Sequence, residues 1–295
     1  MHRPFRYRIK IKIKESNVVT HTNLVKAAVA SHVALDTIDG GNGYLGGAAP
    51  YCGLTCRELG VDPILVTKVG EDFPANMRHL LQEKGLGIKK FEKYPTTRFE
   101  LKQQGYRRKV YLRAKCTPLS VGDVENIDAD GWIVSPIIDE VPSQVLRQVI
   151  KKNKFVILDP QGYMRKVHPS GLISINRTIN LDVSGISAIK VDEEELKALG
   201  NVSPKFLIST TTRIIRMNQY QIELQHIDTP DTTGIGDILT AAFTCAHLKE
   251  GDPKWSICYA AGALKAALES KSLGIAKIPS KSRTEKNASD FFNNI

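Results

Sequence analysis

Short apolar runs alternate along the chain with segments in which apolar residues recur every three or four positions. Runs such as KFVILDP and KFLISTT predict buried strands, and segments such as ANMRHLLQEKG and SQVLRQVIKKN predict helices. The alternation begins after residue 22 and continues into the second half of the chain. It predicts an α/β fold with a mostly parallel sheet and helices on both faces, in which ligands gather at the carboxyl ends of the strands.

One segment, TTRFELKQQGYRRKVYLRAK at residues 96–115, does not fit this alternation. Apolar and polar residues alternate on both sides of its Gln-Gln-Gly turn, which is typical of an antiparallel hairpin. A hairpin with one apolar face must cover something, so we expect a lid over a ligand pocket, a dimer contact, or both. Arg98 and Arg113 project from this hairpin and are candidates for substrate contact, although solvated strand positions are the commoner place for such arginines.

The last third of the chain predicts two helices, at 238–249 and 255–269, that are apolar nearly all round and therefore buried. The segment that follows, KSRTEKNASDFFNNI, is polar and is expected to be frayed except where Phe291 and Phe292 dock.

The length of 295 residues and the ordinary composition, 42% hydrophobic and 24% charged, predict a globular protein with a sizeable core. No stretch is long and apolar enough for a membrane span and the start does not resemble a signal peptide, so we expect a cytoplasmic protein. An odd number of cysteines without a C-x-x-C pair favours free, packed thiols: Cys52, Cys56, Cys116, Cys245 and Cys258.

The net charge of +10 is concentrated near the start of the chain. Basic and apolar residues alternate there with a period of two, which predicts a strand or arm at residues 1–22 with one cationic face. The simplest interpretation is an edge strand protected from aggregation by its charge, and the alternative is a nucleic-acid-binding arm. We do not expect a nucleic acid to be the main partner. The basic residues are Arg3, Arg6, Arg8, Lys10, Lys12 and Lys14.

The strongest chemical signal is DTTGIGDILTAAF at residues 231–243. Its glycines allow backbone amides to converge at the start of a buried helix, where the helix dipole adds partial positive charge, and an anion fits there. A fixed carboxylate at Asp237 would repel that anion unless it faces a neutral hydroxyl that attacks the anion. The amides of Gly234, Ile235, Gly236 and Asp237 would then hold a transferring phosphoryl group while Asp237 accepts the hydroxyl proton. The alternative is an acid that only caps the helix.

This segment resembles the second signature of the ribokinase-like (PfkB) carbohydrate kinase family, D-T-x-G-A-G-D, with Asp231, Thr232, Gly234, Gly236 and Asp237 matching. Ile235 differs from the usual small residue. Further segments are similar to the family in the same order from residue 27 onward. The resemblance implies a single kinase domain at 23–295, in three layers, with a discontinuous small antiparallel β lid at about 37–46 and 92–116.

The resemblance also assigns roles to residues. SHVALDTI and GGAAPYCGL imply an acceptor site with Asp36 on the substrate hydroxyls and a close approach of substrate to Gly46 and Gly47, with Ala34 and Tyr51 where asparagines are common. KVDEEEL is similar to the N-x-x-E motif near the metal, with Asp192 in place of Asn and Glu195 retained, and such a carboxylate pair suits a hydrated Mg²⁺. The other acceptor-side candidates are Gly41, Asn42 and Asp159, with Gln161 beside it.

On the donor side, ISTTTRIIR stands where the family has a T-x-G-x-x-G turn at the nucleotide, and Thr211 and Ile214 occupy the glycine positions. The hydroxyls of this segment, Thr210 and Thr211 among them, would bind ATP together with Thr232. Tyr259 stands where relatives place an Asn beside the adenine, so it either stacks on the base or packs in the core.

The resemblance therefore implies ATP-dependent phosphorylation of a small polyol, sugar or nucleoside, with a lean towards the inositol-kinase-like and archaeal branches. The dimer contact offered by the hairpin would make the protein a homodimer through the lid. One alternative is a family member that has lost catalysis and only binds a polyol or nucleotide. Another is an oxidoreductase, because GNGYLG at 41–46 satisfies G-x-G-x-x-G, the pattern of a dinucleotide-binding turn.

Overall fold

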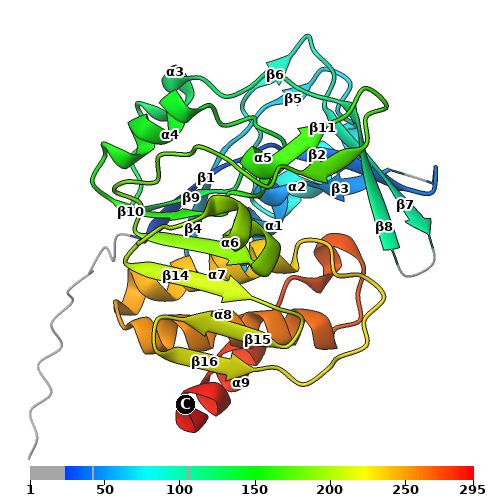
Figure 1. Cartoon of the computed structure of the whole chain (residues 1–295). Coiled ribbons are helices and arrows are strands. Elements are labelled where there is room, and N and C mark those ends of the chain that lie inside the picture. The colour runs from blue at the N-terminus through cyan, green and yellow to red at the C-terminus, as the bar shows by residue number, and fades with distance from the viewer. Residues whose placement is uncertain (1–23, 42, 105–106) are drawn as a thin grey trace, which may run out of the picture.

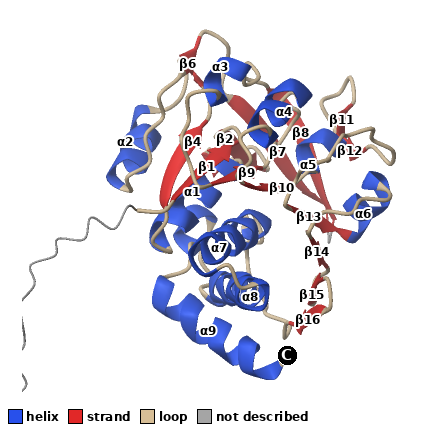
Figure 2. Cartoon of the chain, turned by 90° about the vertical axis from the view of Figure 1, so that its left-hand side faces the viewer, coloured by secondary structure: helices blue, strands red, loops and turns tan. Residues whose placement is uncertain are grey.

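The structure is a computed structural model that describes residues 24–41, 43–104 and 107–295. The basic arm predicted at residues 1–22 and the predicted substrate contact of Asn42 lie outside the described residues. The predicted fold class is confirmed, since a mostly parallel central sheet lies between two layers of helices (Figures 1 and 2).

The central sheet has eight strands among the described residues, in the order β16-β15-β14-β13-β10-β9-β1-β4. Strands β14 to β4 of this order run parallel, and β15 and β16 extend one edge as an antiparallel hairpin. The strands are β1 (Lys26–Ala30), β4 (Asp62–Val66), β9 (Gly131–Val134), β10 (Phe155–Leu158), β13 (Ala188–Asp192), β14 (Phe206–Thr210), β15 (Ile214–Met217) and β16 (Tyr220–Glu223).

Two separate apolar cores form on the two faces of this sheet. Helices α1 (Ala48–Glu58), α7 (Ile235–Glu250) and α8 (Pro253–Glu269) cover one face, and α3 (Val121–Val124), α4 (Ser143–Ile150) and α6 (Glu193–Leu199) cover the other. The remaining helices are α2 (Ala75–Glu83), α5 (Gln161–Met164), η1 (Gly274–Lys277) and α9 (Lys281–Asn294), and the small strands are β5 (Val69–Gly70), β6 (Phe91–Glu92), β11 (Arg165–Val167) and β12 (Ile173–Ile175).

The alternation of side chains along the central strands decides which polar residues meet α7. Three apolar side chains of neighbouring strands belong to the core on the α7 face: Ile133, Ile157 and Ala188. Because successive strand residues point to opposite faces, the residue two positions further along each strand falls on the same face. These residues are Ser135, Asp159 and Lys190, so the parallel strands bring three polar groups to one edge of the sheet, beneath α7.

The segment expected to form a hairpin does so, as β7 (Thr97–Gln104) and β8 (Arg107–Ala114). It joins β2 (Ala34–Ile38) and β3 (Tyr44–Gly46) in a four-stranded sheet of order β3-β2-β7-β8, which we call the lid sheet. Its strands pair antiparallel except β2 and β7, which run parallel. Phe99 and Leu101 on β7 are buried, so the apolar face of the hairpin does cover part of the molecule.

The C-terminal segment is more ordered than expected. Instead of fraying, Lys281–Asn294 forms the regular helix α9, which packs along α8. Thr284, Asn287 and Ala288 form its buried face, and the ring of Phe292 lies edge-on to Trp255 with 5.7 Å between ring centroids. Phe291 and Phe292 pack against the core as expected. The prediction of fraying was wrong because the buried face is small and partly polar, so it gives little hydrophobic periodicity.

All five cysteines are free and buried, as expected. No helix within the described residues has both the length and the apolar character that a membrane crossing requires.

The contact between α8 and α9 predicts the effect of Gly262→Ala. A methyl group at this position would lie 2.7 Å from both the amide nitrogen of Ala288 and the carbonyl oxygen of Thr284, so α9 would have to move. Such overpacking costs about 1–3 kcal/mol, which exceeds the roughly 1 kcal/mol gained from helix propensity. We expect a lower free energy of unfolding in urea and faster trypsin cleavage within α9.

Gly87→Ala is the matched control, because a methyl group there meets nothing within 4 Å. It should leave both measurements near the wild-type values. An increase in stability for Gly262→Ala, with unchanged cleavage, would show that α9 is not held at this contact.

Candidate active site

The turn at the start of α7 has the geometry of an anion site. Gly234 caps the helix in the left-handed conformation, with φ of 77°, and a side chain there would lie 2.3 Å from the ring of Tyr51. Only glycine satisfies both conditions. The first amides of a helix have no acceptor within it and point out of its N-terminal end. The predicted group of Gly234, Ile235, Gly236 and Asp237 therefore lies together, at the wall of a cavity.

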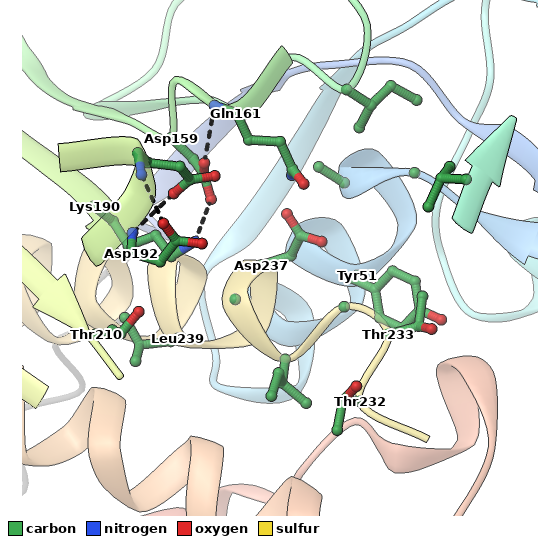
Figure 3. A pocket seen from close by; sticks show the side chains of 18 of the residues that line it. Tyr51, Asp159, Gln161, Lys190, Asp192, Thr210, Thr232, Thr233, Asp237 and Leu239 are labelled. Carbon is green, nitrogen blue, oxygen red and sulfur yellow. Dashed lines mark hydrogen bonds and ion pairs between the residues drawn. The ribbon is translucent and has the colours of Figure 1, made fainter. Parts of the chain in front are cut away.

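Asp237 lies in the first turn of α7 and its carboxylate faces the cavity rather than the core (Figure 3). The hydroxyl of Ser135 donates a hydrogen bond to its Oδ1 over 3.2 Å. Burial, and then the negative charge of Asp159, raise the pKa of Asp237 to about 7, against the opposing effects of Lys190, Ser135 and Arg165. The carboxyl group is thus tuned near neutral pH, where a general base works best.

A buried ion pair lies beside Asp237. The ammonium of Lys190 is 2.9 Å from Oδ2 of Asp159, and both side chains are almost completely buried. Burial acts to lower the pKa of Lys190, but the carboxylates of Asp159 and Glu195 raise it above its ordinary value, so the amine stays charged. The ammonium of Lys190 also lies 3.0 Å from the position that a Cβ atom would take on Gly236, so its charge lies close to the turn at the start of α7.

The two predicted metal ligands also line the cavity. Asp192 caps α6: its Oδ1 accepts the amide of Glu195 over 2.7 Å, and Oε2 of Glu195 accepts the amide of Asp192 over 2.8 Å. Burial and the charge of Asp159 raise the pKa of Glu195 to about 7. Each carboxylate keeps a second oxygen, and this set fits Mg²⁺, which takes one or two carboxylates and completes its shell with water and phosphate. Within the described part of the chain, no cluster of three or more metal-ligating side chains exists.

These groups surround a cavity of about 410 Å³, a size typical of small-ligand sites. Thr210, Thr211, Asp192 and Glu195 line one part of it, and Asp36, Gly47, Phe99 and Leu101 line another. In the close-up, Asp237 lies between the group around Lys190 and the ring of Tyr51 (Figure 3). The cavity thus combines residues that the sequence had assigned separately to donor and acceptor, including Thr232.

The part of the cavity covered by the lid sheet contains an arginine that the sequence analysis did not assign. Arg165 donates to the carbonyl of Ile137 over 2.7 Å and to Oε1 of Gln161 over 2.6 Å. Its guanidinium lies over the ring of Phe99, 5.5 Å from the centroid. Burial lowers the pKa of Arg165, while the carboxylates of Glu140, Asp159 and Asp36 act against this effect. Gln161, Arg165 and Asp36 together place hydrogen-bonding groups around an otherwise apolar wall.

The glycines before α1, which were predicted to contact the substrate, lie in different environments. A side chain on Gly46 would lie 2.0 Å from Oδ2 of Asp36, so this position is kept open by the protein's own carboxylate. Gly47 lines the cavity, whereas Gly46 does not. Gly41 lies in the turn after β2, where its amide donates to the carbonyl of Ile38 over 2.8 Å, and it is not among the lining residues.

Besides Gly41 and Gly46, three more predicted ligand contacts do not line the cavity. Tyr259 lines a smaller pocket between α7, α8 and α9, beside Trp255, which agrees with the core-packing alternative rather than with adenine stacking. Arg98 forms an ion pair with Asp72, and Arg113 forms one with Glu100. Both arginine side chains are partly exposed, and their guanidinium groups are engaged in these ion pairs.

The dinucleotide-binding alternative does not have its required geometry. The fingerprint needs its glycines in a single turn between a strand and a helix. Here Gly41 and Gly43 lie in the turn between β2 and β3, Gly46 ends β3, and α1 begins only at Ala48. These strands belong to the lid sheet rather than to the central sheet.

The residues that the sequence analysis missed carry weak local signals. Ser135 directly follows the apolar strand β9, and Lys190 lies in the middle of β13, where a charged residue within a buried strand could have been noticed. Arg165 follows the short helix α5 and gives no sequence pattern of its own.

Comparison with known proteins adds to this geometry. No family model matches the sequence, and a search of curated proteins finds no match either. Among solved structures, a pyrophosphate-dependent kinase in the ribokinase family, complexed with a pyrophosphate analog and myo-inositol, is 19% identical with a TM-score of 0.74, covering 88% of this chain and 99% of its own.

Two further solved structures have the same fold. The nucleoside kinase of Methanocaldococcus jannaschii is 18% identical with a TM-score of 0.67, over 90% of this chain and 99% of its own. The ribokinase of Arabidopsis thaliana, complexed with ribose and ATP, is 18% identical with a TM-score of 0.64, over 90% of this chain and 98% of its own. The chain therefore has the ribokinase fold over nearly all of its described length, as its sequence motifs suggested.

Proposed function

We propose that the protein is a kinase that transfers a phosphoryl group from ATP to a hydroxyl of a small polyol, sugar or nucleoside, with an inositol-like polyol favoured. The observation that carries this proposal is the position of Asp237: a carboxylate with a pKa near 7, in the first turn of α7, facing the cavity that Asp36 also lines. A base beside a group of helix amides suits a neutral nucleophile that attacks an anionic electrophile.

In this reaction the hydroxyl oxygen of the acceptor attacks the γ-phosphorus, the bond from that phosphorus to the bridging oxygen of ADP breaks, and the hydroxyl proton passes to Asp237. Because Ser135 already donates to Oδ1, the other carboxylate oxygen accepts the proton. The amides of Gly234 to Asp237 and the nearby ammonium of Lys190 hold the charge on the transferred group.

Asp192 and Glu195 would hold Mg²⁺, which would supply positive charge to neutralise the donor phosphates. The carboxylates themselves need to be ionised for this role, and a bound cation lowers their pKa. Thr210, Thr211 and Thr232 offer hydroxyl groups to the donor from the rim of the cavity.

The acceptor end of the cavity supports a small polyhydroxylated substrate. Asp36, Gln161 and Arg165 provide acceptors and donors at fixed places, while Phe99 and Leu101 of the lid sheet close the apolar side. Excluding water matters because the base would otherwise activate water. The solved structures of this fold include complexes with myo-inositol and with ribose, both of this chemical class. A homodimer through the lid hairpin stays a prediction.

The donor is ATP in this proposal, with inorganic pyrophosphate as the other donor to test. Structures of this fold include both an ATP complex and pyrophosphate-dependent kinases. Thr211 and Ile214, at the positions of the family glycines, close a tight turn, in which the hydroxyl of Thr211 accepts the amide of Ile214 over 2.9 Å. Because the family glycines are absent from this turn, it also supports the second candidate function, a polyol- or nucleotide-binding module without catalysis.

Asp237→Asn tests the proposal directly. We expect turnover to fall about 10²–10⁴-fold, the usual contribution of a general base, because an amide cannot accept the hydroxyl proton. Product formation from ATP and from pyrophosphate would be followed across polyols, sugars and nucleosides. Asp252→Asn is the control, because Asp252 caps α8 and Asn caps a helix equally well.

Equal turnover by wild type and Asp237→Asn on the best acceptor would exclude Asp237 as the base. Thermal stabilisation of the wild type by acceptors, without transfer from either donor, would favour the binding module.

The pKa of Asp237 predicts a pH profile. Since only the carboxylate form accepts a proton, kcat/KM should rise with pH through an apparent pKa of about 7. Ser135→Ala removes a hydrogen bond that lowers this pKa, so the rise should move to higher pH. The measurement is kcat/KM between about pH 5.5 and 9 for both proteins. A profile that Ser135→Ala leaves in place would show that another group titrates.

A further inference from the structure

Lys277 is a buried lysine that the proposed mechanism does not use. Its side chain is only 1% exposed, although it ends the short helix η1, between α8 and α9. The ammonium lies 2.7 Å from Oδ2 of Asp231, and it donates to the carbonyl oxygens of Asp231 over 2.7 Å and of Thr233 over 3.0 Å. A buried ammonium is costly unless it is paired and hydrogen-bonded, and here three oxygens of one turn surround it.

The carboxylate of Asp231 also connects the turn at 231–233 to η1. It accepts the amide of Gly274, at the start of η1, over 2.8 Å, and the amide of Thr233 over 2.8 Å. Burial acts to raise the pKa of Asp231, but Lys277 and these two amides hold it below its ordinary value. Asp231 therefore stays ionised, and the turn at 231–233 is fixed from one side by η1.

The two carbonyls that Lys277 binds control the direction of amides that matter for the anion site. A peptide group is planar and trans, so the N–H of each residue points opposite to the carbonyl of the residue before it. When the ammonium holds the carbonyl of Thr233, the N–H of Gly234 must point away from Lys277. Gly234 lines the cavity, and Lys277 is not among the lining residues.

We propose that Lys277 is a positioning residue: its ammonium acts as an internal cation that orients the peptide groups of the 231–234 turn and so aims the Gly234 amide at the transferring phosphoryl group. This inference rests on the proposed function and adds a residue to it. Lys277 acts through the turn and does not touch the ligand, whereas Lys190 lies at the cavity itself. The backbone amides would bind phosphate on the cavity side of the 231–234 turn, and the ammonium of Lys277 on the other side of the turn would hold them in the required direction.

Lys277→Met keeps the length and apolar stem of the side chain and removes the charge. We expect kcat to fall at least about tenfold, and at most by the roughly 10²–10³-fold seen when one anion-hole donor is lost outright. The KM of the acceptor should change less than about twofold, because the acceptor end of the cavity is untouched. Lys152→Met is the matched control, because the ammonium of Lys152 also donates to two backbone carbonyls, those of Glu125 and Ile127, far from this turn.

Lys277→Ala leaves room for a small cation, which provides a readout that a purely structural lysine would not give. Added ammonium, methylammonium or potassium ions should restore part of kcat in Lys277→Ala and leave Lys152→Ala unchanged. If either Lys277 variant fails to fold, Asp231→Asn tests the same arrangement with little change in size, and it too should lower kcat more than it changes the KM of the acceptor.

Binding of inorganic pyrophosphate, measured by calorimetry, separates this inference from the proposed function. The wild type and Lys152→Met should bind it, and Lys277→Met should bind it at least about tenfold more weakly, at matched thermal stability. A wild type that binds pyrophosphate but transfers no phosphoryl group would end the kinase proposal and leave the role of Lys277 supported. Equal binding by the wild type and Lys277→Met, including no binding by either, or a folded Lys277→Met with unchanged kcat, would overturn the inference.

Discussion

The ion pair between Lys190 and Asp159 sets the electrostatics on which the cavity depends. Among the described residues, the carboxylates of five acids line one small space: Asp36, Asp159, Asp192, Glu195 and Asp237. Burial and mutual repulsion already raise the pKa of Glu195 and of Asp237 to about 7. Without a buried cation among them, more of these acids would take up protons, because a carboxylate out of water is stable only when paired or neutral. The charge of Lys190 is thus what would allow ionised acids to lie beside the proposed anion site.

The turn before α7 is fixed by contacts from separate parts of the chain. The ring of Tyr51 on α1 packs against Gly234, and η1 holds Asp231 and Thr233 from behind. The hydroxyl of Ser135, just after β9, restrains the carboxylate of Asp237. A group of amides that is held in this way needs no rearrangement when charge develops on a ligand, which is the main advantage of a preorganised anion site.

Local signals in the sequence were enough for the fold class and for the turn at 231–237, because strand periodicity and a glycine-rich helix start are short-range features. Lys190, Arg165 and Lys277 could not be assigned in this way. Their partners lie elsewhere in the chain, and only the order of strands and the path of η1 bring them together. Tyr259 was ambiguous for a related reason: α8 is apolar on every side, so its sequence does not indicate which face meets a ligand.

The lid sheet carries both a cavity-lining carboxylate, Asp36, and an aromatic residue that covers the cavity, Phe99. Asp36 on β2 is paired in register with Phe99 on β7, so the carboxylate and the aromatic cover are neighbours in the same hydrogen-bonded sheet. A displacement of one strand carries the other with it. In the proposed kinase, binding of a hydroxyl by Asp36 and exclusion of water by Phe99 would therefore occur together, and a ligand too large to fit under Phe99 would also lose its contact with Asp36.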